Sequence, residues 1–201
     1  MTKIEEIELI INKFIEEEGY KDNKHVLGVI FCGSYLTGLY REGSDIDLQI
    51  IFDDNDPNHM IRGNDNIDGI RIEYFEKPLA DHYAQIEDNL EKQDNAIMSI
   101  IGKGKIIYDT DNKLKELQGT VLEKYSKELP KIPDEKLSED MLEMEEKFQE
   151  LEHLKTENND YFYQLYYLII EKIVRLYHNI NNIPRIELSK GFKIYTDDMQ
   201  Q

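Results

Sequence analysis

Cysteine is almost absent from this sequence, in which Cys32 is the single example among 201 residues. One thiol cannot close a disulfide within the chain, and a zinc site with paired cysteines would need a second chain to contribute. The histidines also lack the spacing of metal ligands; they are His25, His59, His82, His153 and His178. A chain of this length can instead bury a hydrophobic core that needs no covalent or zinc cross-link.

Long hydrophobic runs are missing as well. After Met1, Thr2 and Lys3 the chain continues as an amphipathic acidic stretch, without the apolar centre of a signal peptide. No segment approaches the roughly 20 consecutive apolar residues that a membrane helix requires. We therefore expect a cytoplasmic protein without a membrane partner. The apolar residues, 40% of the chain, fall into short periodic runs that a disordered chain would lack.

Positive charge is scarce, because 24 Lys and Arg face 42 Asp and Glu, and the net charge is −18. Nucleic-acid binding depends on lysine and arginine to neutralise phosphates, so this surface would repel a long polynucleotide. The same field would attract a cationic small molecule, although an acidic, solvated surface is the simpler interpretation. We expect no long nucleic acid as a partner.

The first half of the chain alternates between helical and strand-like apolar patterns. Its first helix has a capping box of Thr2 and Glu5, and Gly19 follows its end. The third strand is entered through an Asp68-Gly69 turn. The predicted elements are a helix at 2–18, strands at 25–32, 45–52, 67–75 and 105–108, a short helix within 35–41, and helical segments within 79–101.

The second half shows helical periodicity alone. Pro130 and Pro133 flank Lys131 and predict a boundary between a domain at 1–129 and a helical domain at 130–201. Two apolar stripes follow at three- and four-residue spacing, over 137–151 and 162–177, and predict a helical bundle. Its tyrosine-rich stripe is expected in the core, with the wall of a ligand pocket as the alternative. The fold class is therefore α+β.

The most informative pattern is Gly33-Ser34, ten intervening residues, and then Asp45-Ile46-Asp47-Leu48. Residues two apart on a strand point to the same face, so both aspartates project together while Ile46 and Leu48 enter the core. Two carboxylates so close require cations, and hard oxygen ligands suit Mg²⁺. A third carboxylate, Glu73, alternates on its own strand with Ile72 and Tyr74.

Gly33 and Ser34 follow the first strand directly. A glycine at that point lets backbone amides approach a phosphate without an intervening side chain. A helix that begins immediately afterwards would add its positive end and its free N–H groups. The two residues therefore predict a cradle for a triphosphate.

These motifs resemble the polymerase-β-like nucleotidyltransferases, in particular the bacterial antibiotic nucleotidyltransferases such as the aminoglycoside and lincosamide adenylyltransferases. The resemblance covers about the first 110 residues well and the helical half in outline. It rests on Gly33-Ser34, the ten-residue spacer, Ser44 to Leu48, the strand Arg71 to Phe75, and a weaker echo in Gly104 to Asp109.

The resemblance implies a mixed sheet with flanking helices and a site for two Mg²⁺ ions. Asp45 and Asp47 would bind both ions, and Glu73 would bind one of them. Gly33 and Ser34 would hold the triphosphate, and Ser44 would support carboxylates or phosphates. Lys190 or Lys193 would approach the phosphates, with an ordinary solvent-exposed lysine as the alternative.

One further carboxylate, Glu76, is an alternative third ligand or a general base. Its spacing of three residues from Glu73 turns it to the opposite face of a regular strand. We therefore expect Glu76 on the solvated surface. The residues leave the general base unassigned.

The resemblance implies a Mg-dependent nucleotidyltransferase that moves AMP from ATP, or the nucleoside monophosphate of another NTP, to a hydroxyl of a small-molecule acceptor and releases pyrophosphate. An aminoglycoside-like antibiotic would suit as acceptor, which would make antibiotic resistance a role for the chain; whether resistance results is left open by the residues. The alternatives are a protein AMP-transferase of a toxin–antitoxin pair and a catalytically silent module that senses nucleotide or binds a partner. We expect a monomer or a homodimer, the latter through helices within 137–181.

Overall fold

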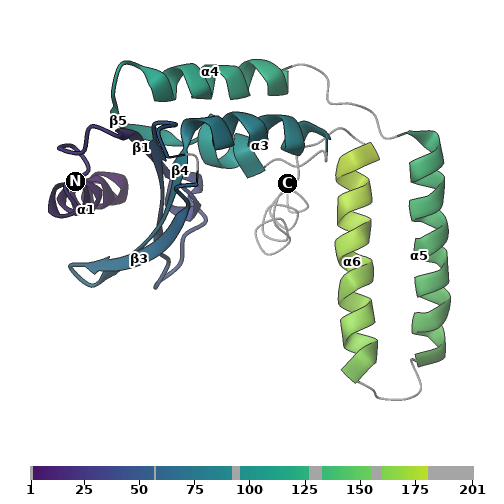
Figure 1. Cartoon of the computed structure of the whole chain (residues 1–201). Coiled ribbons are helices and arrows are strands. Elements are labelled where there is room, and N and C mark those ends of the chain that lie inside the picture. The colour runs from purple at the N-terminus through teal and green to yellow at the C-terminus, as the bar shows by residue number, and fades with distance from the viewer. Residues whose placement is uncertain (1, 57, 92–95, 127–132, 155–159, 181–201) are drawn as a thin grey trace. The chain divides into compact units, whose positions relative to one another are not determined.

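The computed structural model describes residues 2–56, 58–91, 96–126, 133–154 and 160–180. The chain divides into two compact units, Met1–Lys127 and Glu128–Gln201. The boundary predicted at residue 130 falls among residues that the structure does not describe, so it stays a prediction. The predicted α+β class, a mixed sheet with flanking helices followed by a helical part, is confirmed (Figure 1).

The first unit is built around a five-stranded sheet with the order β3-β4-β2-β1-β5. Strands β2 and β4 are parallel, and every other neighbouring pair is antiparallel. The central strands β1 and β2 are nearly continuous apolar runs because both of their faces are covered. The strands are β1 (Val26–Cys32), β2 (Ile46–Phe52), β3 (Ile61–Ile67), β4 (Ile70–Pro78) and β5 (Lys105–Asp109).

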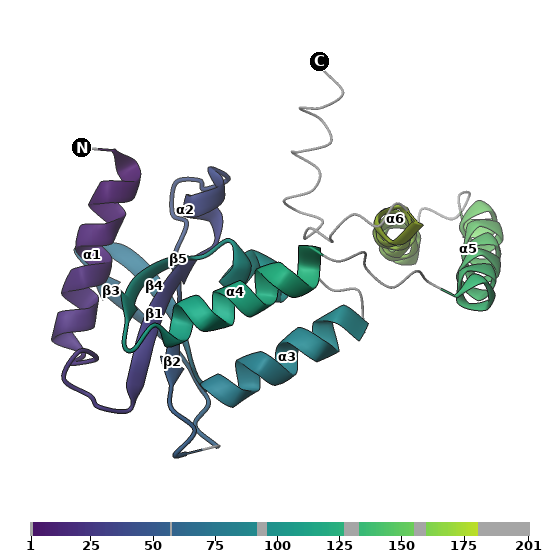
Figure 2. The same ribbon diagram turned by 90° about the horizontal axis from the view of Figure 1, so that it is seen from above.

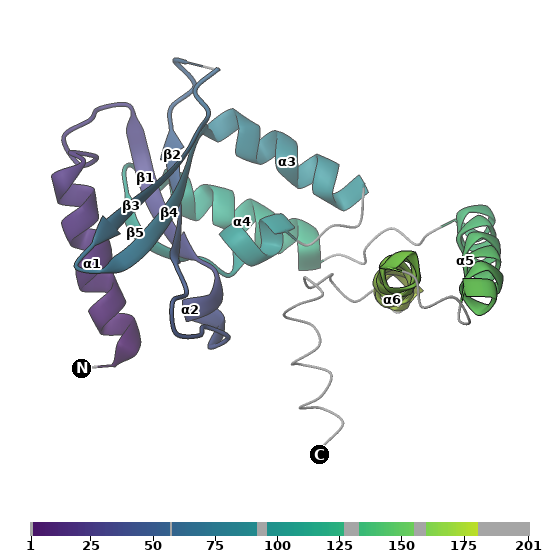
Figure 3. The ribbon, with the colours of Figure 1, turned by 90° about the horizontal axis from the view of Figure 1, so that it is seen from below.

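Helices cover the two faces of this sheet separately (Figure 2). Helix α1 (Lys3–Glu17) begins at the predicted Thr2–Glu5 capping box and packs one apolar stripe on the first face. Helices α3 (Leu79–Glu91) and α4 (Lys113–Ser126), with the π-helical turn η1 (Met98–Gly102), form a second core on the other face (Figure 3). Helix α4 was not predicted from the sequence.

The predicted strand at 67–75 is wrong in its limits. Ile67 ends β3, the Asp68-Gly69 turn follows with φ of 54° and 85°, and β4 begins at Ile70. Together β3 and β4 form a hairpin at the edge of the sheet. Strand β3 escaped prediction because its central residues, Arg62 to Asn66, are polar or glycine and show no apolar alternation.

The position of Glu76 is partly as predicted. It does lie on the face opposite Glu73, but its 7% exposure contradicts the expected solvated surface. The Tyr20 hydroxyl donates to Glu76 Oε1 at 2.6 Å, and His59 Nε2 lies 2.7 Å from Oε2. Burial, together with this hydrogen bond, raises the pKa of Tyr20. Glu76 is therefore a buried structural carboxylate, in which protein partners replace water.

The second unit contains two long helices, α5 (Asp134–Leu154) and α6 (Asp160–Ile180), which contact each other. Leu165, Ile169 and Leu176 of α6 are buried. Tyr166 and Tyr177 belong to the stripe predicted in the core, but they are about half exposed, because among the described residues of this unit only α5 covers α6, along one stripe. In the described part of the chain, no helix is both long and apolar enough to cross a membrane.

His82 on α3 generates a prediction about acid stability. Its side chain is 1% exposed, neither ring nitrogen has a hydrogen-bond partner, and burial, with a smaller effect of Lys77, lowers its pKa to about 4. The unfolded chain therefore binds a proton that the folded chain excludes between pH 6.5 and about 4. The free energy of unfolding should fall by roughly 3 kcal/mol across this window as pH drops.

Urea denaturation at several pH values measures this dependence. Replacing His82→Leu should flatten the slope between pH 6.5 and 4, because the group that takes up the proton on unfolding is gone. The variant His153→Leu, at an exposed position of α5, serves as the control. If the pH dependence of the free energy of unfolding is unchanged in the His82 variant, His82 is not its cause.

Candidate active site

The start of β2 places the predicted carboxylates on one face of the sheet. Asp47 pairs with Cys32 of β1 on one side and with Glu73 of β4 on the other. Register partners in a sheet project from the same face, so the carboxylates of Asp47 and Glu73 are neighbours across two parallel strands. Ile46 and Leu48 are fully buried in the core under α1. Asp45 directly precedes β2, two residues from Asp47.

Gly33 lies directly against the carboxylate of Asp47. It follows β1 with φ 83° and ψ −158°. This backbone conformation is essentially restricted to glycine. A methyl group on Gly33 would fall 1.8 Å from Asp47 Oδ2 and 2.7 Å from its Cγ. The structure therefore brings together the glycine bend and the second aspartate of the motif, and only glycine allows this approach.

The predicted helix after Gly33 is short. Helix α2 contains only Ser34–Thr37 and ends at Gly38, so its dipole is much smaller than that of a long helix. The Ser34 carbonyl accepts the Thr37 hydroxyl at 3.1 Å and the Leu39 amide at 3.1 Å. Any phosphate binding here would depend on amide groups at the bend more than on the helix dipole.

Ser44 belongs to the loop that leads into Asp45. Its hydroxyl oxygen accepts the Arg41 amide at 2.8 Å, and its carbonyl accepts the Tyr35 hydroxyl at 3.1 Å. Tyr35 also stacks on Tyr40 with ring centroids 4.8 Å apart. The loop is thus fastened to α2 directly before Asp45. The sequence interpretation had given Tyr35 no role, since a lone aromatic in a spacer carries no specific signal.

Arg62 on the edge strand β3 forms an ion pair with the third carboxylate, Glu73. Arg62 Nε donates to Glu73 Oε1 at 2.7 Å, and a second guanidinium nitrogen donates to the same oxygen. The guanidinium also lies over the Phe75 ring, 5.0 Å from its centroid. Sequence reasoning missed Arg62 together with β3. A hairpin drawn around Asp68-Gly69 would have found it, because the register pairs Arg62 with Phe75 on the face of Glu73.

The donor atoms fit a magnesium ion that is shared with a nucleotide. Among the described residues, no group of three or more His, Cys, Asp or Glu side chains could hold a metal ion, so Asp45, Asp47 and Glu73 do not form a three-carboxylate cluster. Mg²⁺ usually takes only one or two protein carboxylates and completes its shell with water and substrate phosphates. Asp47 offers this hard-oxygen chemistry beside Gly33, with Glu73 in register on β4 and Asp45 two residues earlier in the chain. Lys190 lies outside the described residues.

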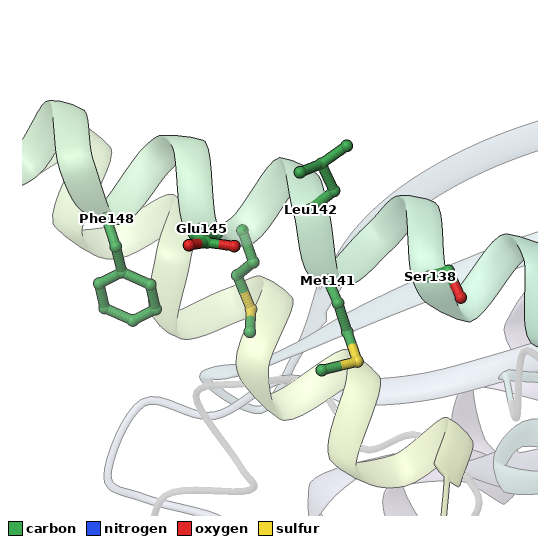
Figure 4. A pocket seen from close by; sticks show the side chains of 6 residues that line it. Ser138, Met141, Leu142, Glu145 and Phe148 are labelled. Carbon is green, nitrogen blue, oxygen red and sulfur yellow. The ribbon is translucent and has the colours of Figure 1, made fainter.

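A surface hollow of about 530 Å³ occurs in the second unit (Figure 4). All of its lining residues project from successive turns of α5, so one helix forms its whole wall. They are Ser138, Met141, Leu142, Met144, Glu145 and Phe148. None of the predicted site residues belongs to it, and a single helix face cannot enclose a ligand.

The sequence and structure have counterparts among known proteins. A family model described as a nucleotidyltransferase domain matches residues 10–188, a range that includes the glycine bend and all three carboxylates. A solved nucleotidyltransferase-like protein from Exiguobacterium sibiricum 255-15 is 16% identical with a TM-score of 0.46. The match covers 90% of this chain and 60% of that chain. No curated protein matches the sequence.

The contact between Gly33 and Asp47 predicts a specific energetic coupling. Gly33→Ala should lower the free energy of unfolding by about 1–3 kcal/mol, because the backbone conformation is strained and the methyl group displaces the Asp47 carboxylate. In an Asp47→Ala background the same change should cost less, since the atoms that clash most are gone. Urea denaturation of the four proteins measures the coupling.

The variant Gly19→Ala controls for loss of a glycine at positive φ, because a methyl group there meets nothing within 4 Å. It should show no coupling to Asp47→Ala. Equal costs of Gly33→Ala in both backgrounds would refute the close contact.

Proposed function

Since the chain belongs to the nucleotidyltransferase-domain family, we propose that it transfers a nucleoside monophosphate from a magnesium-bound nucleoside triphosphate to a hydroxyl of a small molecule. The observation that carries the proposal is the close approach of Gly33 to the Asp47 carboxylate, with Glu73 in register on the next strand. This arrangement supports a nucleotide whose phosphates lie at the bend while its metal ions contact the carboxylates.

In the proposed reaction, Asp45 and Asp47 would hold two Mg²⁺ ions and Glu73 would hold one of them. When bound, such ions neutralise phosphate charge and stabilise the attacking and leaving oxygens. The pairing of β2 with β1 and β4 holds Asp47 in place, and the absence of a side chain at Gly33 lets the bend lie against the Asp47 carboxylate. Ser44 keeps the loop before Asp45 in position through its bond to Arg41.

The acceptor oxygen forms a bond to the α-phosphorus, the bond from that phosphorus to the bridging oxygen breaks, and pyrophosphate leaves. The acceptor proton passes to water or to a carboxylate of the site. The chain's own contribution is to position these groups, because phosphoryl transfer depends mainly on alignment and charge stabilisation.

The charge of the chain supports a cationic or neutral acceptor over a polyanion. A net charge of −18 raises the local concentration of cations and disfavours long nucleic acid. An aminoglycoside-like compound, which carries both hydroxyls and positive charge, matches this field. We propose ATP as the donor and a monomer or homodimer as the working form.

Release of pyrophosphate tests the function directly. Purified protein with Mg²⁺ should release pyrophosphate with at least one of the four NTPs and with an acceptor from a panel of aminoglycosides, lincosamides and cellular metabolites. Asp47→Asn should lower the rate by roughly 10²–10³-fold, the usual loss when one group that stabilises transition-state charge is removed. Asp22→Asn, with the same charge change at an exposed loop position, should retain the rate.

Nucleotide binding, followed by isothermal titration, separates the alternatives. Binding without turnover by any acceptor would favour the catalytically silent sensor, and turnover with a protein acceptor alone would favour protein AMP transfer. If the chain neither binds NTP with Mg²⁺ nor releases pyrophosphate, the proposed function is wrong.

A further inference from the structure

We propose that Arg62 is a positioning residue that holds Glu73 before the metal-bound nucleotide arrives, so that a metal ion must displace the arginine to reach this carboxylate. The inference rests on the proposed function, because it assigns Glu73 as a metal ligand. It adds a residue from the edge strand β3 to a site otherwise formed by β1, β2 and β4, and it makes metal affinity depend on an ion pair.

The geometry of the pair is suited to such exchange. Both hydrogen bonds of Arg62 end on Oε1 of Glu73, so the guanidinium does not span the two carboxylate oxygens. The side chain of Glu73 is 15% exposed and that of Arg62 is 68% exposed. An arginine so open to water loses little when it leaves its partner, because water replaces the lost hydrogen bonds. The Phe75 ring gives the guanidinium a second contact beside the carboxylate.

The negative charges of Asp47 and Glu73, which share one face of the sheet, favour a cation beside them. Asp47 and Glu73 are register partners on strands that neighbour each other at the usual sheet spacing of about 4.8 Å. Two carboxylates that project from the same face of neighbouring strands repel each other, and the ion pair of Arg62 with Glu73 offsets this repulsion. A divalent ion between the carboxylates would take over that task and release the arginine.

Loss of the arginine should strengthen metal binding at Glu73, because the competing cation is gone. Mn²⁺ is the probe, and its free concentration is followed by electron paramagnetic resonance without nucleotide. Arg62→Gln removes the competitor for Glu73 and should tighten Mn²⁺ binding about two- to fivefold, the range expected for release of an exposed ion pair. A purely structural role of Arg62 would leave Mn²⁺ affinity unchanged or weaken it.

Arg71→Gln is the matched control. Arg71 is an exposed arginine on β4, two residues from Glu73 on the same strand and face, so its loss changes the net charge of the region equally. It should alter Mn²⁺ affinity less than Arg62→Gln does. In a Glu73→Gln background, Arg62→Gln should have no tightening effect, because the pair is already broken. Thermal unfolding of each variant shows whether the fold is retained.

Several outcomes overturn the proposal. Equal tightening by both arginine variants would assign the effect to general charge, and tightening that persists without Glu73 would exclude the pair as its cause. Absence of measurable Mn²⁺ binding in both the native protein and Arg62→Gln also contradicts it.

Pyrophosphate release, measured separately, distinguishes this inference from the proposed function. Tightening by Arg62→Gln without any turnover supports the ion-pair exchange and rejects the transferase. Turnover in the native protein with unchanged Mn²⁺ affinity in Arg62→Gln rejects the exchange alone.

Discussion

The contact between the Gly33 backbone and the Asp47 carboxylate is the constraint on which the candidate site depends. The bend at the end of β1 and the beginning of β2 can meet only because no side chain stands between them. The antiparallel pairing of Cys32 with Asp47 places the carboxylate next to the bend. The hydrogen bond from the Tyr35 hydroxyl to the Ser44 carbonyl holds the loop between the two strands against α2. A larger residue at the bend would push it away from the Asp47 carboxylate.

Strand β4 extends this arrangement by a parallel pairing. It places Glu73 beside Asp47 on the site face, whereas Glu76, three residues on, points into the core under α1 with Tyr20 and His59 as partners. Because successive side chains of a strand alternate between the two faces of the sheet, Glu73 and Glu76 lie on opposite faces of β4 and have different roles. One acid remains near solvent with an exchangeable arginine, and the other is buried with fixed partners.

The two faces of the sheet differ in their side chains: one is packed under α1, and the other carries Asp47 and Glu73. The face under α1 is a mostly apolar core that also encloses Glu76. The other face carries the carboxylates near the start of β2 and β4, and the packing of α3, α4 and η1 farther along the strands. Rigid strands with apolar partners on the reverse side are a suitable base for charged groups, because the packing limits how far repulsion can move them.

Local spacing in the sequence determined the central strands, the first helix and the outward direction of Asp47 on its strand, because these depend on chain periods of 2.0 and 3.6 residues. The tertiary structure decided which strands are neighbours. It placed polar strand β3 at the edge, aligned Glu73 with Asp47, delivered Arg62 to Glu73 and buried Glu76. Pairing register between distant segments arises from packing of the whole sheet, and no local pattern encodes it.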